Sequence, residues 1–137
     1  MPVISRLGQL RVEIMVENIK GFFDRFVEDF SSFDGEVISS RYLAPYLAVS
    51  RDGDIWECSR PIELVDYFQT LLDKHSAQGV LSCQYSGLEW AAIGNRCFSA
   101  SVTWTMLGAE NNVISTWRES YNLMQTDSGL KIFTSID

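Results

Sequence analysis

The stretch from Arg96 to Leu107, RCFSASVTWTML, constrains the fold more than any other part of this chain. Its alternate residues are apolar: Phe98, Ala100, Val102, Trp104 and Met106. Small hydroxylated residues fill the positions between them: Ser99, Ser101, Thr103 and Thr105. A period of two with β-branched and aromatic residues predicts a strand with one buried face. We therefore expect a sheet with this strand in its interior.

Similar patterns on both sides predict further strands at Val80–Ile93, Val113–Gln125 and Leu130–Ile136. The turns between them contain Gly94-Asn95, Gly108 to Asn112, and Thr126 to Gly129. Such short connections predict an antiparallel meander. The alternation slips near Gly87, which indicates a β-bulge there.

Helical patterns precede these strands. The first predicted helix carries an apolar stripe of Met15, Ile19, Phe22, Phe23, Phe26 and Phe30. A short second helix is expected from the Asp34 cap through Val37, Ile38, Arg41 and Tyr42, ending before Pro45. A small hairpin then pairs Leu47–Ser50 with Ile55–Cys58 around Asp52-Gly53-Asp54. A third helix runs from a Ser59 cap to Gly79, with a buried stripe of Leu64, Val65, Phe68, Leu71 and Leu72.

The length of 137 residues, 46% of them hydrophobic, predicts a single domain over residues 1–137 with a real core. Helices followed by a long antiparallel sheet predict an α+β fold. The apolar helix stripes need a partner, and a strongly bent sheet wrapped around the helices supplies one. Such a sheet leaves a hydrophobic pocket on its concave face.

Charge and composition exclude several function classes. The net charge is −7 without a basic stripe, which argues against nucleic acid and against anionic membrane surfaces as partners. The apolar runs are too short to span a bilayer, and the N-terminal stretch up to Met15 does not have a signal-peptide pattern. Cys58, Cys83 and Cys97 lack pairing motifs and predict a reduced, cytoplasmic chain. His75 is the only histidine, so we expect no metal site, and no motif indicates a cofactor.

The order of elements resembles the nuclear-transport-factor-two-like superfamily, including its SnoaL-like and ketosteroid-isomerase-like branches. The resemblance rests on the long first helix, on Tyr42-Leu43-Ala44-Pro45, on Ser59-Arg60-Pro61-Ile62-Glu63, and on the terminal hairpin. That hairpin contains Arg118 to Met124 followed by Asp127-Ser128-Gly129-Leu130-Lys131-Ile132. The resemblance implies a cone-shaped sheet around a hydrophobic pocket, and a homodimer packed through the outer face of the sheet.

The isomerase branch uses a tyrosine in the first helix, an aspartate after the second, and an acid in the penultimate strand. Here the first helix offers Phe23 and Asp24, the stretch Ala48 to Arg51 has no carboxylate although Asp52 is adjacent, and Tyr121 occupies the region of the acid. These departures argue against ketosteroid isomerase chemistry.

The strand Val113–Gln125 carries the best candidate for acid–base chemistry. One of its faces holds Trp117, Glu119 and Tyr121, and two large aromatics favour burial on the concave side. Glu119 between them would have a raised pKa. The structural alternative is a Glu119 at the pocket mouth, or one paired with Arg118 or Arg51. His75, in the last turn of its helix, favours a solvated or dipole-linked role.

Aromatic residues supply the candidate pocket lining: Phe22, Phe26, Trp56, Trp104, Trp117 and Tyr121. Core packing alone would also explain most of them. The leading interpretation is a domain that binds a small apolar or aromatic molecule. The second is an isomerase, cyclase or dehydratase using Glu119 or Asp52 with Tyr121, and the third is an association domain whose product is the dimer.

Overall fold

The computed structural model describes residues 6–137. Residues 1–5, part of the stretch assessed above for a signal peptide, lie outside this range. The helices are α1 (Arg6–Phe30), α2 (Gly35–Ser39), α3 (Pro61–Ala77) and the short 3-10 turn η1 (Ala109–Asn111). The strands are β1 (Tyr42–Val49), β2 (Ile55–Cys58), β3 (Ser82–Ile93), β4 (Cys97–Leu107), β5 (Val113–Thr126) and β6 (Gly129–Ile136). Within residues 6–137 no helix combines the length and the hydropathy needed to cross a bilayer.

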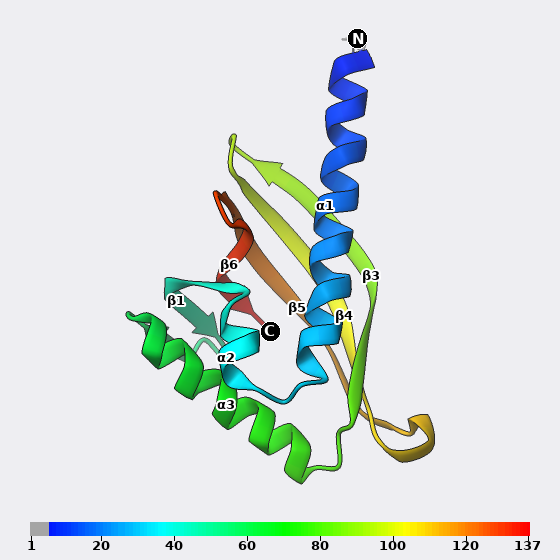
Figure 1. Cartoon of the computed structure of the whole chain (residues 1–137), viewed down its shortest axis with the longest axis vertical. Coiled ribbons are helices and arrows are strands. Elements are labelled where there is room, and N and C mark those ends of the chain that lie inside the picture. Colours follow the sequence, from blue (N-terminus) through cyan, green and yellow to red (C-terminus); the bar gives the residue numbers. More distant parts are fainter. Residues whose placement is uncertain (1–5) are drawn as a thin grey trace.

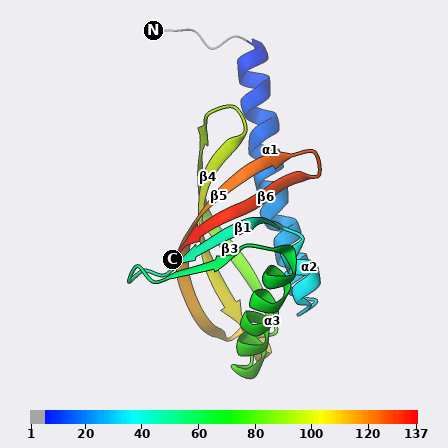
Figure 2. The same ribbon diagram turned by 90° about the vertical axis from the view of Figure 1, so that its left-hand side faces the viewer.

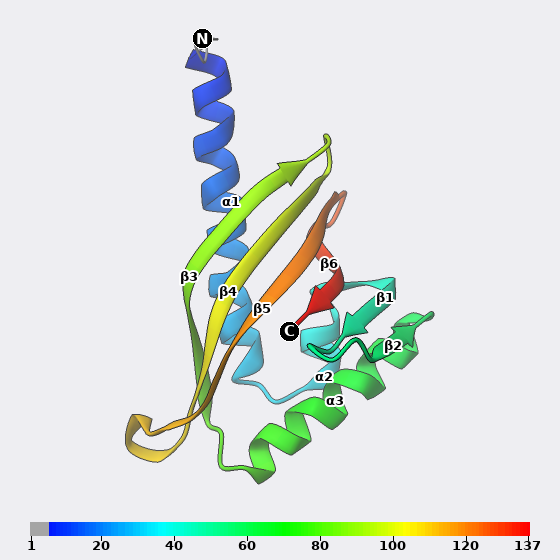
Figure 3. The same ribbon diagram turned by 180° about the vertical axis from the view of Figure 1, so that it is seen from behind.

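The sheet is open and has the strand order β2-β1-β6-β5-β4-β3. All its pairs are antiparallel except β1 with β6, which run parallel. The strands curve around one side of the molecule (Figure 2), where α1 and α3 lie. From behind, β3, β4 and β5 face the viewer without a helix over them (Figure 3). The α+β class and the bent sheet around the helices are as predicted.

Helix α1 lies along the concave side of the sheet, and its N-terminal end extends beyond the strands (Figure 1). The predicted stripe is buried at Ile19, Phe22, Phe23, Phe26 and Phe30. Toward the N-terminus the same helix exposes Leu7, Leu10 and Ile14. The stripe thus packs against the sheet only over the second half of the helix.

Strand β4 forms the interior strand that its alternation predicts, because β3 and β5 pair with its two edges. Phe98, Ala100, Val102, Trp104 and Met106 are all buried. The predicted bulge is also present, since the β3–β4 register shifts between Ser86 and Glu89, around Gly87 with a φ of 64°. The backbone at Gly87 has a positive φ, which residues with a Cβ atom rarely adopt.

The predicted second helix is too long. Helix α2 ends at Ser39, and Tyr42 begins β1 instead of continuing the helix. The physical reason is distant in sequence: β1 pairs with β6, with Tyr42 opposite Ile132 and Leu47 opposite Thr134. Pro45 follows a cis peptide bond and lies where this register shifts, so its missing N–H disturbs no regular ladder. The Asp34 cap is confirmed, because its carboxylate accepts from the Glu36 N–H at 2.9 Å.

The β1–β2 hairpin and α3 are present as predicted, but Val65 and Leu71 of the predicted stripe are only half-buried, and the helix cap differs. Val49 pairs with Ile55 across the turn at Asp52-Gly53-Asp54. The N-cap of α3 is Arg60, not Ser59, and the Glu63 carboxylate accepts from the N–H groups of Ser59 and Arg60 at 2.6 and 3.0 Å. Glu63 therefore satisfies two of the backbone donors that a helix start leaves free.

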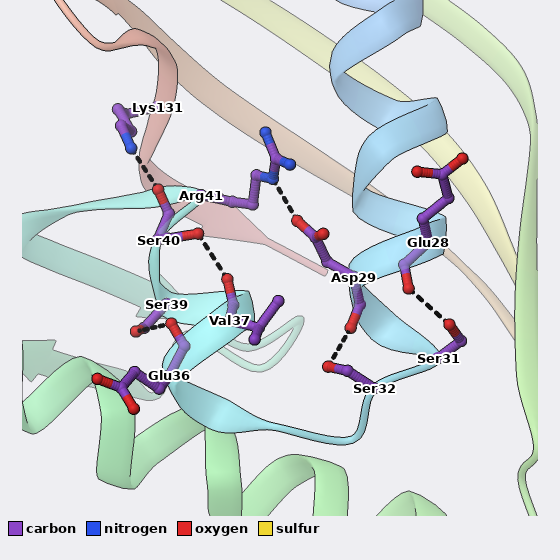
Figure 4. Close-up of polar contacts among 10 residues, drawn as sticks. All are labelled: Glu28, Asp29, Ser31, Ser32, Glu36, Val37, Ser39, Ser40, Arg41 and Lys131. Atoms are coloured by element: carbon purple, nitrogen blue, oxygen red, sulfur yellow. Dashed lines mark hydrogen bonds and ion pairs between the residues drawn. The ribbon is translucent and has the colours of Figure 1, made fainter.

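Polar contacts join the end of α1, α2 and β6 (Figure 4). Arg41 Nε donates to Asp29 Oδ2 at 2.5 Å, and Lys131 Nζ donates to the Ser40 carbonyl. Ser31 and Ser32 donate to the carbonyls of Glu28 and Asp29, each at 2.6 Å. These bonds satisfy carbonyl groups at the C-termini of two helices and fix α2 beside the sheet.

Candidate functional site

A cavity of about 670 Å³ lies between the helices and the concave face of the sheet. Residues from α1, α2, α3 and all six strands contribute to its wall. Much of that wall is aromatic. Its aromatic side chains include Phe26, Tyr42, Tyr46, Tyr67, Trp104 and Trp117. A pocket of this size and character suits a small organic molecule.

Strand β5 places its polar group inside this cavity. Trp117, Glu119 and Tyr121 alternate along the strand, so all three point to the concave side and line the cavity, as predicted. The neighbouring strand brings Trp104 directly opposite Trp117 in register. Two adjacent strands thus place one carboxylate within a largely aromatic wall.

A chain of hydrogen bonds connects these side chains. The Trp104 indole Nε1–H donates to the Tyr121 hydroxyl at 2.7 Å, and that hydroxyl donates to Glu119 Oε2 at 2.7 Å. Trp117 Nε1–H donates to the same Oε2 at 3.3 Å. Glu119 Oε1 has no hydrogen-bond partner among residues 6–137. The network therefore orients Glu119 while leaving one of its oxygens available.

Burial raises the pKa of Glu119 above its ordinary value of 4.5. The hydrogen bonds from Tyr121 and Trp117 lower this pKa, and the nearby negative charge of Asp137 raises it. No ion pair offsets the burial within the described chain. Arg118 lies on the opposite face and pairs with Glu89 at 3.4 Å, and Arg51 is exposed. The ion-paired alternative for Glu119 is therefore wrong, because the pleat directs the side chains of Arg118 and Glu119 to opposite faces.

The pKa of the Tyr121 hydroxyl is also raised, first by burial and then by the charge of Glu119. The pKa of Tyr42 is raised as well, first by burial and then by the nearby Tyr46 and Glu119. Both phenols therefore stay protonated at neutral pH and can act only as neutral hydrogen-bonding groups.

His75 is half-buried, whereas the sequence favours a solvated or dipole-linked side chain. Its ring stacks on Trp117, with centroids 6.0 Å apart and planes 5° apart, and meets the edge of Phe30 at 5.8 Å. His75 Nδ1 is buried without a partner in the structure, and burial lowers the pKa of the imidazole. The buried stripe of α3 already contained the signal, because His75 follows Phe68 and Leu72 at spacings of seven and three.

The remaining predicted site residues divide into three groups. Phe26 and Trp104 line the cavity and are buried, whereas Trp56 stands at its mouth and is 59% exposed. Phe22 is buried behind the wall against Phe23 and does not line the cavity. Asp52 lies in the exposed β1–β2 turn, outside the cavity, so its carboxylate cannot act there.

The lining residues that the sequence did not indicate include Tyr42, Tyr46, Tyr67 and Asp137. Tyr46 shares a buried hydrogen bond with Ser135 of β6, and the Asp137 N–H donates to the Val49 carbonyl at 3.2 Å. Both contacts depend on the parallel β1–β6 pair. No local sequence pattern predicts such a pairing, which explains why the sequence does not indicate Tyr46 and Asp137.

Metal and thiol chemistry find little support in the described residues. His, Cys, Asp and Glu do not gather there in groups of three that could hold a metal ion. The three cysteines are free, and burial raises the pKa of the cavity residue Cys83 to about 12. A thiol of that acidity is a poor nucleophile at neutral pH. The cytoplasmic location stays a prediction.

Comparison with known families identifies the fold. A family model described as NTF2-like protein (DUF6841) matches residues 16–136. The chain belongs to this NTF2-like family. The comparison with curated proteins gave no match.

Solved structures share the NTF2-like fold at low sequence identity. A Novosphingobium aromaticivorans NTF2-like protein with a cystatin-like fold aligns at a TM-score of 0.74 and 10% identity, over 98% of this chain and 90% of its own. A proposed NTF2-like dehydratase from Streptomyces avermitilis aligns at 0.65 and 13%, over 90% and 95%. A proposed calcium/calmodulin-dependent protein kinase II association domain from Xanthomonas campestris aligns at 0.61 and 9%, over 86% and 82%. These likenesses concern the fold, which hosts several functions.

Proposed function

We propose that this NTF2-like domain binds a small, mainly apolar or aromatic molecule in its concave cavity, with a polar group of the ligand directed at Glu119. The observation that carries the proposal is the cavity of about 670 Å³, whose aromatic wall converges on one oriented carboxylate. Ligand sites in proteins commonly combine an apolar enclosure of about 300–1,000 Å³ with a few fixed polar groups.

Isothermal titration with tert-butylbenzene, a neutral apolar probe, tests this proposal. Binding should change the tryptophan emission, because Trp56, Trp104 and Trp117 line the cavity. Trp117→Ala should weaken binding and, because the indole is half-buried, also destabilise the fold by up to about 3–5 kcal/mol. The matched control is Trp90→Ala, since Trp90 packs on Phe98 outside the cavity. Absence of heat and of any emission change, both with this neutral probe and with its cationic counterpart phenyltrimethylammonium, would contradict the proposal.

The second candidate function is general acid–base catalysis, and one observation favours it. Glu119 lines the cavity without an ion-pair partner among residues 6–137, and burial raises its pKa, which is the direction that favours proton transfer by a carboxyl group. The proposed dehydratase among the similar structures agrees with this candidate at the level of the fold. Tyr121, which donates to Glu119, would orient the carboxylate.

A generic substrate for proton abstraction tests this second function. With 5-nitrobenzisoxazole, the Glu119 carboxylate would take the C3 proton while the N–O bond breaks, giving a cyanophenolate. Glu119→Gln should abolish the reaction, since an amide cannot take that proton at neutral pH. Glu89→Gln is the matched control, because Glu89 pairs with Arg118 on the other face. Equal rates in all three proteins would exclude catalysis by Glu119.

A further inference from the structure

We propose that the ligand of this cavity is an organic cation, an ammonium group carried on an apolar or aromatic body. The inference rests on the proposed binding function and adds the chemical class of the ligand. Three independent features support it: the sign of the charges around the cavity, the free oxygen of Glu119, and the exposed surface of the lining aromatics.

The charged residues that line the cavity are mostly acidic. They are Asp66, Glu119 and Asp137, against the single cation Lys74. The charge of Asp137 acts on Glu119, so these two carboxylates lie within electrostatic reach of each other. Lys74 is exposed near the end of α3 and forms no ion pair with any of the three. A cation entering the cavity would offset the repulsion between the two carboxylates, whereas an anion would add to it.

Arginine residues do not provide an alternative site for an anion. None of them lines the cavity among the described residues. Arg41 is paired with Asp29, Arg60 with Glu63, and Arg118 with Glu89. A carboxylate or phosphate ligand would therefore find Lys74 alone, at the edge of the cavity.

Glu119 presents one oxygen to the cavity. Oε2 already accepts from Tyr121 and Trp117, whereas Oε1 has no partner within residues 6–137. Oε1 is also not sealed inside the protein, since the only fully buried side-chain polar atom without a partner there is His75 Nδ1. An ammonium ion beside Oε1 would supply the opposite charge that this half-buried carboxylate lacks.

The aromatic wall suits the same ligand. Trp56, Tyr67 and Trp117 line the cavity and keep part of their surface exposed. The indole N–H of Trp117 donates to Glu119, so the carboxylate and an aromatic ring lie side by side in the cavity. Cations bind over the faces of Trp and Tyr, and quaternary ammonium groups are commonly recognised in this way.

A pair of probes with the same shape isolates the charge. Phenyltrimethylammonium and tert-butylbenzene differ in one atom, nitrogen against carbon, and hence in one positive charge. Titrated into the wild-type protein at neutral pH, the cation should bind about tenfold more tightly than its neutral counterpart. Glu119→Gln should remove that preference by weakening the cation alone, and Glu89→Gln should leave both affinities unchanged.

The outcomes separate this inference from the function on which it rests. Equal or tighter binding of tert-butylbenzene by the wild type would overturn the cation proposal and leave the binding function intact. Binding of neither probe would overturn both. The wild-type comparison decides the question even if Glu119→Gln does not fold, and an unchanged preference in a folded Glu119→Gln variant would also overturn the proposal.

Discussion

Burial of Glu119 shifts its pKa, and this shift should make the stability of the protein depend on pH. Its pKa in the folded protein is raised, so the folded state holds its proton at pH values where the unfolded chain has lost it. The contribution of Glu119 to the stability of the folded protein is fully present below its ordinary pKa of 4.5. It is lost as pH rises through the pKa of Glu119 in the folded protein. Glutamine has nearly the shape of the protonated acid and does not titrate.

At about pH 4, Glu119→Gln should therefore have nearly the same unfolding temperature as the wild type. As pH rises, the unfolding temperature of the variant should exceed that of the wild type by a growing margin. The difference in midpoint between the two proteins, followed by circular dichroism, isolates this residue from the other carboxylates. A difference that is constant or shrinks with rising pH would show that Glu119 is not desolvated.

His75 should produce the opposite trend. Burial lowers its pKa below the ordinary value of 6.5, so the unfolded chain takes up a proton that the folded protein resists. Its contribution to stability is present above about pH 6.5 and is lost as pH falls through the folded value. His75→Phe retains a ring beside Trp117 without a titrating nitrogen. The variant should gain stability relative to the wild type on acidification, and thermal melts from neutral to acidic pH measure this gain.

At the scale of elements, replacing either of two helical glycines by alanine should have opposite effects on stability. A Cβ on Gly35 would lie 2.7 Å from the Val65 carbonyl and 2.8 Å from the Gln69 backbone nitrogen, so Gly35→Ala should force α2 away from α3. A Cβ on Gly21 would meet only the flexible end of Arg25, at 3.3 Å. Gly21→Ala should stabilise the protein by up to about 1 kcal/mol through helix propensity. Urea unfolding of both variants measures the contrast, and stabilisation by both would refute the close helix packing.

The elements that could be predicted from sequence are those whose pattern is local. The meander from β3 to β6 follows from alternation and short turns, and this correctly places Trp117, Glu119 and Tyr121 on one concave face. The sequence predicts a helix at Tyr42 because the Tyr42 end of β1 pairs with the distant strand β6 and not with β2. For the same reason Tyr46 and the other lining residues of β1 could not be assembled with β5 in advance.

At the scale of the whole molecule, the outer face of the sheet supports the proposal of a homodimer. The row Ser99, Ser101, Thr103 and Thr105 lies on the face that no helix covers. Small side chains allow another sheet to approach to about 10 Å. Light scattering at tens of micromolar should report a dimer, and Ser101→Arg should weaken it by placing a charge in the contact. Ser128→Arg, in the exposed β5–β6 turn, is the control, and a wild-type monomer at these concentrations would contradict the proposal.

Association alone does not account for the interior of the molecule. An association domain with no ligand would be expected to fill its cone with Trp56, Trp104 and Trp117. Instead Trp56 is directed to the mouth and a cavity of about 670 Å³ stays open. The proposed dimerisation and the proposed ligand binding would use opposite faces of one sheet, so the two proposals are compatible.

The parallel pairing of β1 with β6 has a consequence for how the chain reaches this state. The hairpin of β1 and β2 is formed by residues early in the chain, yet its place in the sheet is defined by β6, with Tyr42 opposite Ile132. Closing so long a loop is slow compared with forming the meander. Synthesis from the N-terminus adds to this delay, since β6 emerges last of all the strands. We expect the β1 wall of the cavity to be the last part to fold, and the site to be absent from any intermediate that lacks the β1–β6 pair.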